Sequence, residues 1–346
     1  MARRLNCLLV GWLVLLAGCI QISSVETAVL PTVMSTAILP TAVSATLPPA
    51  PDTATPLPTA LPSPTPILAA ATPLPTVTAS PSLVATAVPS LPPSPTSDPG
   101  YTRQVIGYSA GERPLTDYQF GSGPVHIVFI GGIHGGYEWN TILLAYDMID
   151  YFAANLANIP ANLTVHIIPS ANPDGQFLVT GQDERFSPGD VAATSLPGRV
   201  NSNGVDLNRN WDCNWTADAL WRDQPTSGGS APFSEPETQA LSSFLLALEP
   251  AAVIFWHSAA NGVFAGSCND DFQPSLNLAG VYGRAAGYPV YETFTSYPVT
   301  GDAGDWLARQ GIPAASVELL NHENTDWAKN LAGVTAVLRH FSQTNQ

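Results

Sequence analysis

Two histidines and a glutamate stand out as possible ligands of one metal ion. His134 and Glu138 follow the apolar run at 125–130, and His257 follows the apolar run at 252–256. Two imidazoles and one carboxylate are a common ligand set of catalytic zinc, with a fourth position left open. A single histidine of this kind is more often an ordinary hydrogen-bonding residue, so the prediction of one Zn²⁺ ion depends on all three residues meeting.

A second carboxylate, Glu318, lies inside the apolar run at 314–319. Burying an unpaired carboxylate is costly, so this side chain should either form a buried salt bridge or point into a cleft. In a cleft it could act as a general base that takes a proton from water and passes it to a leaving amine. The sequence leaves both interpretations open.

The segment 199–211 contains the most specific pattern of the chain. Arg209 is flanked by Asn208 and Asn210 and follows a strand-like stretch at 204–207. A guanidinium is a planar fork that suits a carboxylate. An isolated arginine is usually a surface residue, but the flanking asparagines favour a binding role.

Four apolar runs of strand length alternate with helical patterns from residue 101 onward. The runs cover 125–130, 164–168, 252–256 and 314–319, and the helical patterns cover 139–156, 236–248, 303–309 and 326–341. This alternation predicts a single-domain α/β three-layer sandwich with a mixed, largely parallel central sheet. In such sheets ligands bind beyond the carboxyl ends of the strands, where the candidate residues lie.

Five blocks of residues 101–346 occur in the order found in the zinc carboxypeptidases of peptidase family M14, and the domain resembles that family. The blocks are 131–138, 168–175, 204–210, 233–238 and 256–258, the last leading on to Tyr297 and Glu318. The resemblance implies that His134, Glu138 and His257 are the zinc ligands. It also implies that Asp206 orients the first histidine.

The same resemblance implies which residues bind or act on the substrate. Asn208 and Arg209 would hold the C-terminal carboxylate of a peptide, Arg199 would stabilise the oxyanion, and Tyr297 would close over the substrate. Glu318 matches the general base of the family. One departure concerns the metal: the family pattern has two residues between the histidine and the glutamate, whereas three separate His134 from Glu138.

Three further expectations concern the surroundings of the site. The pocket-base position of the family falls near Gly304, which favours neutral or apolar terminal residues, although the nearby Asp302 could favour basic ones. The segment 234–237 reads as a capping box, with Ser234 at a helix N-cap and Glu237 three residues later. The segment 172–175 reads as a turn beside the site.

The first residues resemble the export signal of a bacterial lipoprotein. Arg3 and Arg4 precede a short apolar core at 8–16, and small residues lead to Cys19. We expect a signal peptide at 1–18 and a lipid on Cys19 that attaches the protein to a membrane. The alternative is an ordinary signal peptide in which this cysteine is incidental.

Residues 19–100 are expected to form a disordered linker rich in Pro, Thr and Ala, because 18 of the 33 prolines lie between Pro31 and Pro99. The net charge of −15 and the single lysine, Lys329, argue against nucleic acid as a partner. Cys213 and Cys268 remain in the domain and either pair as a disulfide or stay as buried thiols.

These observations together favour a zinc-dependent metallocarboxypeptidase, expected to be a monomer, that hydrolyses extracytoplasmic peptides with a free C-terminal carboxylate. The expected location is the cell surface or the periplasm, attached by the lipid. One alternative is a cell-wall amidase or carboxypeptidase of the same fold. A second alternative is a tethered binding protein that has lost catalysis.

Overall fold

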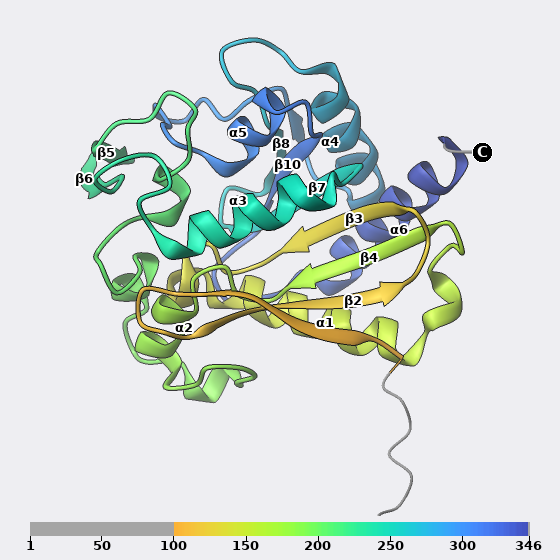
Figure 1. Ribbon diagram of the computed structural model, residues 1–346, viewed down its shortest axis with the longest axis horizontal. Coiled ribbons are helices and arrows are strands. Elements are labelled where there is room, and N and C mark those ends of the chain that lie inside the picture. Colours follow the sequence, from red (N-terminus) through yellow and green to blue (C-terminus); the bar gives the residue numbers. More distant parts are fainter. Residues whose placement is uncertain (1–99, 345–346) are drawn as a thin grey trace, which may run out of the picture. The chain divides into compact units, whose positions relative to one another are not determined.

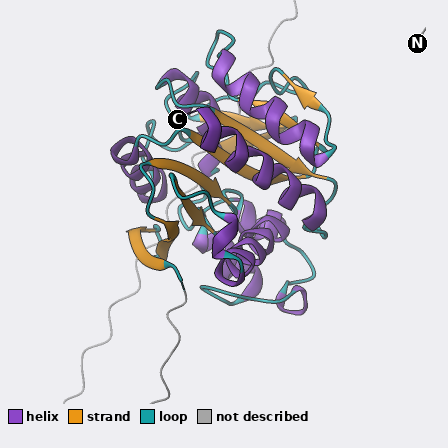
Figure 2. Ribbon diagram, turned by 90° about the vertical axis from the view of Figure 1, so that its right-hand side faces the viewer, coloured by secondary structure: helices purple, strands orange, loops and turns teal. Residues whose placement is uncertain are grey.

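The computed structural model describes residues 100–344, and Figures 1 and 2 show how their helices and strands are arranged. The expected signal at 1–18, Cys19 and the linker up to residue 99 lie outside the described residues. Within residues 100–344, no helix combines the length and the apolar character that a membrane span requires.

An eight-stranded mixed sheet forms the centre of the domain. Its order is β1 (Thr102–Tyr108), β2 (Pro114–Gly121), β4 (Leu163–Ile168), β3 (Val125–Ile130), β7 (Ala252–Ser258), β10 (Ala314–Leu319), β8 (Gly262–Ala265) and β9 (Val290–Tyr291). The four middle strands, β4, β3, β7 and β10, run parallel to one another, whereas β2 and β8 flank them in the antiparallel sense. The predicted mixed, largely parallel sheet is therefore confirmed.

Helices cover both faces of this sheet, as Figure 2 shows. One core contains buried side chains of α1 (Trp139–Ala154), α4 (Gln273–Ala286) and α6 (Trp327–Thr344). The other core contains buried side chains of α3 (Pro236–Leu248) and α5 (Ala303–Arg309). Along β3 the side chains alternate between the two cores, as the period of two in a strand requires. This arrangement is the predicted three-layer sandwich.

The predicted turn at 172–175 is wrong, because this segment begins α2 (Pro173–Thr180). Asn172 is the N-cap residue, and its side chain accepts a hydrogen bond from the backbone N–H of Gly175. Pro173 occupies the first helical turn, where its missing N–H costs nothing. The helix ends at Gly181 in the left-handed conformation. The polar and proline residues of this segment therefore mark a helix start.

The predicted capping box at 234–237 is also wrong. The N-cap residue of α3 is Glu235, and no side chain caps the helix. Glu237 instead accepts a hydrogen bond from the backbone N–H of Ala110, and Glu235 accepts one from Asn201. Both carboxylates are buried and tie distant loops to the start of α3, which positions the segment that follows Asn201.

Two further features were not expected, and one open alternative is resolved. The strand-like stretch at 204–207 does not form a strand of the sheet and makes only an isolated β-bridge between Val205 and Ser227. A small hairpin of β5 (Asp218–Trp221) and β6 (Gln224–Ser227) follows it. Cys213 and Cys268 form a disulfide with a Cα–Cα distance of 6.0 Å, which settles the alternative of free thiols.

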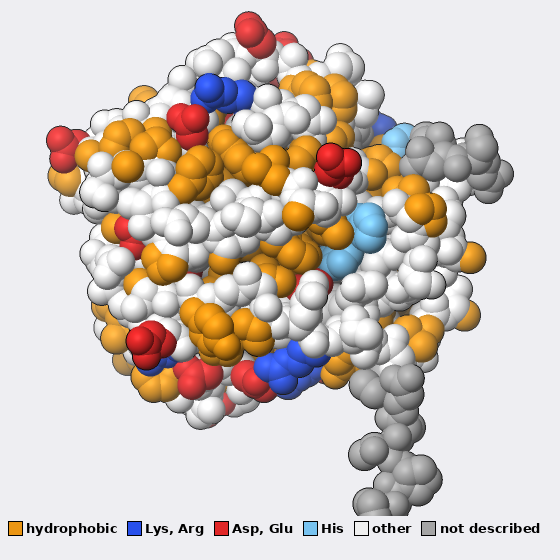
Figure 3. Space-filling model, in the orientation of Figure 1, with side chains coloured by type: hydrophobic (Ala, Val, Ile, Leu, Met, Phe, Trp, Pro, Cys, Tyr) orange, Lys and Arg blue, Asp and Glu red, His pale blue; other side chains and the backbone are white. Residues whose placement is uncertain are grey.

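The surface of the domain carries charges of both signs. On the face drawn in Figure 3, acidic side chains are scattered and basic side chains form small groups rather than a continuous patch. A nucleic-acid-binding surface would need clustered Lys and Arg. The exclusion of nucleic acid as a partner stays a prediction that this face supports.

Candidate metal centre and substrate cavity

The three candidate metal ligands meet at one point. Ligand atoms of His134, Glu138 and His257 all lie within 4.8 Å of one another, and all three residues are buried. The Nδ1 atom of His134 is 2.8 Å from Oε1 of Glu138. The Nδ1 atom of His257 is 3.3 Å from Oε2 of the same carboxylate. Two imidazole nitrogens therefore face one carboxylate.

The backbone after β3 accommodates the extra residue between His134 and Glu138. Gly135 adopts a positive φ of 46°, and a Cβ atom there would lie 2.6 Å from the backbone oxygen of Gly198. Only glycine avoids both the strain and the clash. The 3₁₀ turn Gly135–Glu138 then brings the glutamate back beside the histidine at the start of α1.

The donor set fits zinc. Oε2 of Glu138 is a buried carboxylate oxygen with no hydrogen-bond partner among the described residues, which is costly unless a ligand occupies it. Asp206 is fully buried, and its Oδ1 lies 3.4 Å from Nε2 of His134. With the proton of the ring on Nε2, toward this carboxylate, Nδ1 is free to bind a metal. His134, Glu138 and His257 would thus hold the ion, with Asp206 orienting the first histidine.

The charges of this cluster shift the ionisation of its members. Burial alone would raise the pKa of Glu138, but the charge and hydrogen bond of His134 and the charge of His257 outweigh it and hold this pKa below its ordinary value. Burial alone would lower the pKa of His257, but the adjacent carboxylate of Glu138 raises it instead. The carboxylate is therefore ionised, as a metal ligand must be.

Glu318 lies beside the cluster and faces the cleft. It pairs in register with His257 on the adjacent parallel strand, and its Oε2 accepts a hydrogen bond from the backbone N–H of Ala260. Burial raises its pKa, and the charge of His257 offsets part of this effect. Glu318 forms no ion pair with any residue between 100 and 344, so the buried salt bridge is not found. Its side chain instead borders the cleft.

Arg199 is held next to the first histidine. Its Nε donates a 3.0 Å hydrogen bond to Oδ2 of Asp206, and its Nη2 lies 2.9 Å from Nε2 of His134. The Cζ atom lies 4.5 Å from the centre of the Trp221 ring in the β5–β6 hairpin. The guanidinium is buried and borders a second cavity, which His134 and Glu318 also line.

Asn208 and Arg209 lie in the 3₁₀ turn Leu207–Arg209 and border a cavity of about 220 Å³. Arg209 is only 2% exposed, and its Nε and Nη1 donate hydrogen bonds to the backbone oxygens of Leu220 and Asn208. Its Nη2 has no hydrogen-bond partner in the part of the chain that the structure describes. One guanidinium nitrogen therefore remains for a ligand in the cavity.

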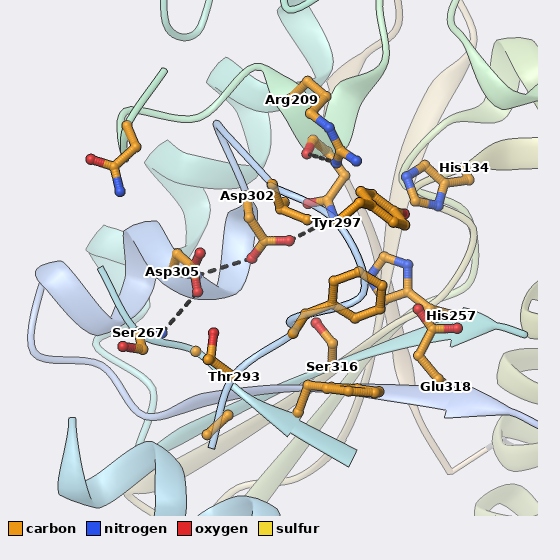
Figure 4. A pocket seen from close by; sticks show the side chains of 17 residues that line it. His134, Arg209, His257, Ser267, Thr293, Tyr297, Asp302, Asp305, Ser316 and Glu318 are labelled. Carbon is orange, nitrogen blue, oxygen red and sulfur yellow. Dashed lines mark hydrogen bonds between the residues drawn. The ribbon is translucent and has the colours of Figure 1, made fainter. Parts of the chain in front are cut away.

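Tyr297 borders both this cavity and the second one, as do Phe294, His134 and Glu318. The rings of Tyr297 and Phe294 contact each other edge-on, with their centres 4.9 Å apart. Figure 4 shows Tyr297 between Arg209 and the histidines. Burial raises the pKa of the phenol, so it stays a hydrogen-bond donor at neutral pH. Its position suits a residue that contacts the substrate.

Two further carboxylates, Asp302 and Asp305, border the cavity at the start of α5, and Asp305 is the one farther from the metal ligands (Figure 4). Asp302 accepts hydrogen bonds from Nδ2 of Asn208 at 2.7 Å and from the backbone N–H of Asp305. Asp305 accepts one from the backbone N–H of Ser267. The sequence-based expectation from Gly304 missed Asp305. The sequence offered one signal for Asp305: it follows Asp302 by three residues, and this spacing places both carboxylates on one side of the start of α5.

Comparisons with known proteins agree with this geometry. The model of the peptidase M14 family, described as zinc carboxypeptidase, matches residues 96–327. Gamma-D-glutamyl-L-diamino acid endopeptidase 1 of Lysinibacillus sphaericus is 25% identical over 62% of this chain. The match spans 59% of that relative's length, which is less than two thirds of it.

A second curated relative, carboxypeptidase B of Astacus astacus, is 28% identical over 60% of this chain and 74% of its own length. The crystal structure of the carboxypeptidase A from Helicoverpa armigera superposes with a TM-score of 0.56 and 18% identity, over 71% of this chain and 69% of that one, and shares the fold. The match to the family model extends over two thirds of the sequence and includes every proposed metal ligand, so this chain belongs to the zinc carboxypeptidase family.

Proposed function

We propose that this domain is a zinc-dependent metallocarboxypeptidase that hydrolyses the C-terminal peptide bond of its substrates. The observation that carries the proposal is one cavity bordered by His134, His257, Glu318 and the unpaired nitrogen of Arg209. A carboxylate bound to the guanidinium would bring the last peptide bond of a chain toward the metal ligands and Glu318.

A zinc ion held by two imidazoles and a carboxylate supplies Lewis acidity toward a carbonyl oxygen and toward water. The protein supplies the proton transfers. Glu318 accepts a proton from the water that attacks the carbonyl carbon, and it passes that proton to the amine released when the C–N bond breaks. Arg199, buried beside His134, offers positive charge to the oxygen on which negative charge develops.

The sharpest test compares peptides that differ only in whether the last carboxylate is free or amidated. The zinc-loaded protein should release the last residue of the free peptides and leave the amidated ones intact. A chelator should stop the release, and added zinc should restore it. Release of no residue from any peptide by a protein that binds zinc would refute the proposal.

A second candidate is a peptidase of the same fold that acts on cell-wall peptides. It is supported by the relative from Lysinibacillus sphaericus, whose name describes cleavage next to a diamino acid. Purified muropeptides serve as the test. Cleavage of muropeptides together with no activity on ordinary peptides would favour this candidate.

The inactive binding protein receives less support, because each residue expected in the chemistry is present and the metal ligands meet. We also propose that the protein is a monomer outside the cytoplasm, attached to a bacterial membrane through a lipid on Cys19. Only the sequence supports this location. Membrane fractionation of the full chain and of a Cys19→Ala variant tests it, since the variant should leave the membrane fraction.

A further inference from the structure

Resting on the proposed function, we infer that the cavity selects substrates whose terminal residue carries a second, cationic group on its side chain. The carboxylates of Asp302 and Asp305 form the receptor for that cation. The chemical class includes lysine, arginine and ornithine at the end of a peptide, and diamino acids at the end of a cell-wall peptide.

The two ends of the cavity have opposite charge. Arg209 borders it near the metal ligands, Asp305 lies on the side away from them, and Asp302 lies between, hydrogen-bonded to Asn208, as Figure 4 shows. A terminal lysine or diamino acid has the matching pattern, with an α-carboxylate at one end and an ammonium group at the other. Arg209 is a nearly fully buried side chain with a free nitrogen on this cavity, so it points to an anionic ligand group independently of the two carboxylates.

Neither carboxylate has a cationic partner in the protein. No lysine or arginine between residues 100 and 344 forms an ion pair with Asp302 or Asp305. Oδ1 of Asp305 accepts the hydrogen bond from Ser267, and Oδ2 accepts none from the described residues. Burial, together with the charge of Asp302, raises the pKa of Asp305. A bound cation would relieve both the burial cost and the repulsion.

The remaining lining of the cavity leaves room for a long side chain to reach these carboxylates. A Cβ atom added to Gly304 would point at Oδ1 of Asp302, 3.3 Å away, and at Oγ of Ser316, 3.9 Å away. A larger side chain at this position would crowd the carboxylate of Asp302, and glycine leaves it uncrowded. Phe264 and Phe294 supply apolar surface for the methylene groups of such a side chain.

The first test uses the wild-type zinc-loaded protein and peptides that differ only in the last residue. Lysine and norleucine have side chains of similar length, but only lysine is charged. A charge-assisted contact predicts a kcat/KM at least about 10-fold higher for lysine. Equal or faster release of norleucine would overturn the inference without any variant. Peptides ending in lysine, arginine or a γ-D-glutamyl-linked diamino acid then distinguish protein-derived from cell-wall substrates.

The second test removes the charge while keeping the shape. Asp305→Asn should lower kcat/KM for the lysine peptide by about 10- to 100-fold. The kcat/KM for the norleucine peptide should change by less than about 3-fold. Asp271→Asn is a matched control, because Asp271 is an exposed carboxylate that does not border the cavity. Equal losses on both peptides would show a general defect and would contradict the inference.

A binding measurement separates this inference from the proposed function. Free L-lysine and free L-norleucine are titrated into the zinc-loaded protein by calorimetry, with wild type and Asp305→Asn. Tighter binding of lysine that depends on Asp305 supports the selectivity even if no peptide is cleaved. Hydrolysis of many peptides without any preference for a cationic terminal residue would refute the selectivity and leave the carboxypeptidase assignment in place.

Discussion

Glu318 and His257 are paired in register on neighbouring parallel strands, although 60 positions of the sequence separate them. The strand β10 thus places the proposed base directly beside a proposed metal ligand. Side chains paired in this way lie on the same side of the sheet, and the rigid strands hold them there. The spatial relation between metal site and base is therefore a property of the sheet and does not depend on a loop.

Glu318→Gln should abolish proton transfer while leaving the metal site intact. The amide has nearly the same shape but cannot accept the proton, so kcat should fall by about 10²- to 10⁴-fold. Zinc content, measured on the same preparation, should stay at that of the wild type. A variant that keeps more than about a tenth of the activity would remove Glu318 from the role of base.

The metal site should bind one zinc ion per chain. His134→Ala and His257→Ala should lose tight binding, and Glu138→Gln should weaken it, because each of these residues contributes one of the three meeting ligand atoms. His340→Ala, which removes a histidine of α6, is the control. Zinc should also raise the unfolding temperature of the wild type, since binding to the folded state alone stabilises it. Unchanged zinc affinity in Glu138→Gln would exclude this glutamate as a ligand.

Asp206→Asn should weaken zinc binding without removing a ligand. Oδ1 of Asp206 lies 3.4 Å from Nε2 of His134, so the charge of Asp206 favours the ring form that leaves Nδ1 free for the metal. Loss of such an orienting carboxylate typically lowers metal affinity by about 10- to 100-fold. Competition with a chelator of known affinity provides the measurement. Equal zinc affinities in wild type and variant would argue that Asp206 only pairs with Arg199.

The disulfide between Cys213 and Cys268 should stabilise the domain. It closes a loop across 55 positions, and replacing both cysteines by serine should lower the free energy of unfolding by about 2–4 kcal/mol. Denaturant titration of the wild type and of the double variant measures the difference. Wild type under reducing conditions is the matched control and should resemble the variant.

Glu237 should make stability depend on pH. Burial raises the pKa of this carboxyl group from 4.5 to about 7, so between these values the folded state holds a proton that the unfolded state has lost. The free energy of unfolding should therefore fall as pH rises from about 4.5 to about 7, by at most about 3 kcal/mol from this group. Glu237→Gln should remove that part of the slope, as denaturant titrations at several pH values would show.

Glu249→Gln, at the exposed end of the same helix, controls for the loss of one negative charge. The comparison is needed because other groups also titrate in this range. If wild type and Glu237→Gln lose stability in parallel between pH 4.5 and 7, the buried carboxyl group is not the cause.

Much of the sheet could be predicted because its central strands are continuous apolar runs. The expected strands at 125–130 and 314–319 and the helices at 236–248 and 303–309 agree with β3, β10, α3 and α5. The edge strands escaped prediction. β1 is mostly exposed and has no apolar run, and β8 has only four residues. Pairing with a neighbour, rather than local pattern, makes these segments strands.

The helix α4 also could not be predicted from its local sequence pattern. It contains Gly280 and Gly283, which disfavour a helix by about 1 kcal/mol each relative to alanine. A Cβ atom at Gly283 would lie 2.4 Å from a methyl group of Val290. The glycine is therefore suited to close packing of the helix against β9, and this packing outweighs the local preference.

The sequence by itself determined which residue types are available for chemistry and which segments form the central layers. His134, His257 and Glu318 could be identified because functional side chains follow or end apolar runs. Only the tertiary structure decided which of these groups meet. Contacts such as Glu138 with His257 and Asn208 with Asp302 join residues about 90 to 120 positions apart. Such contacts arise from the packing of whole layers, which no local pattern encodes.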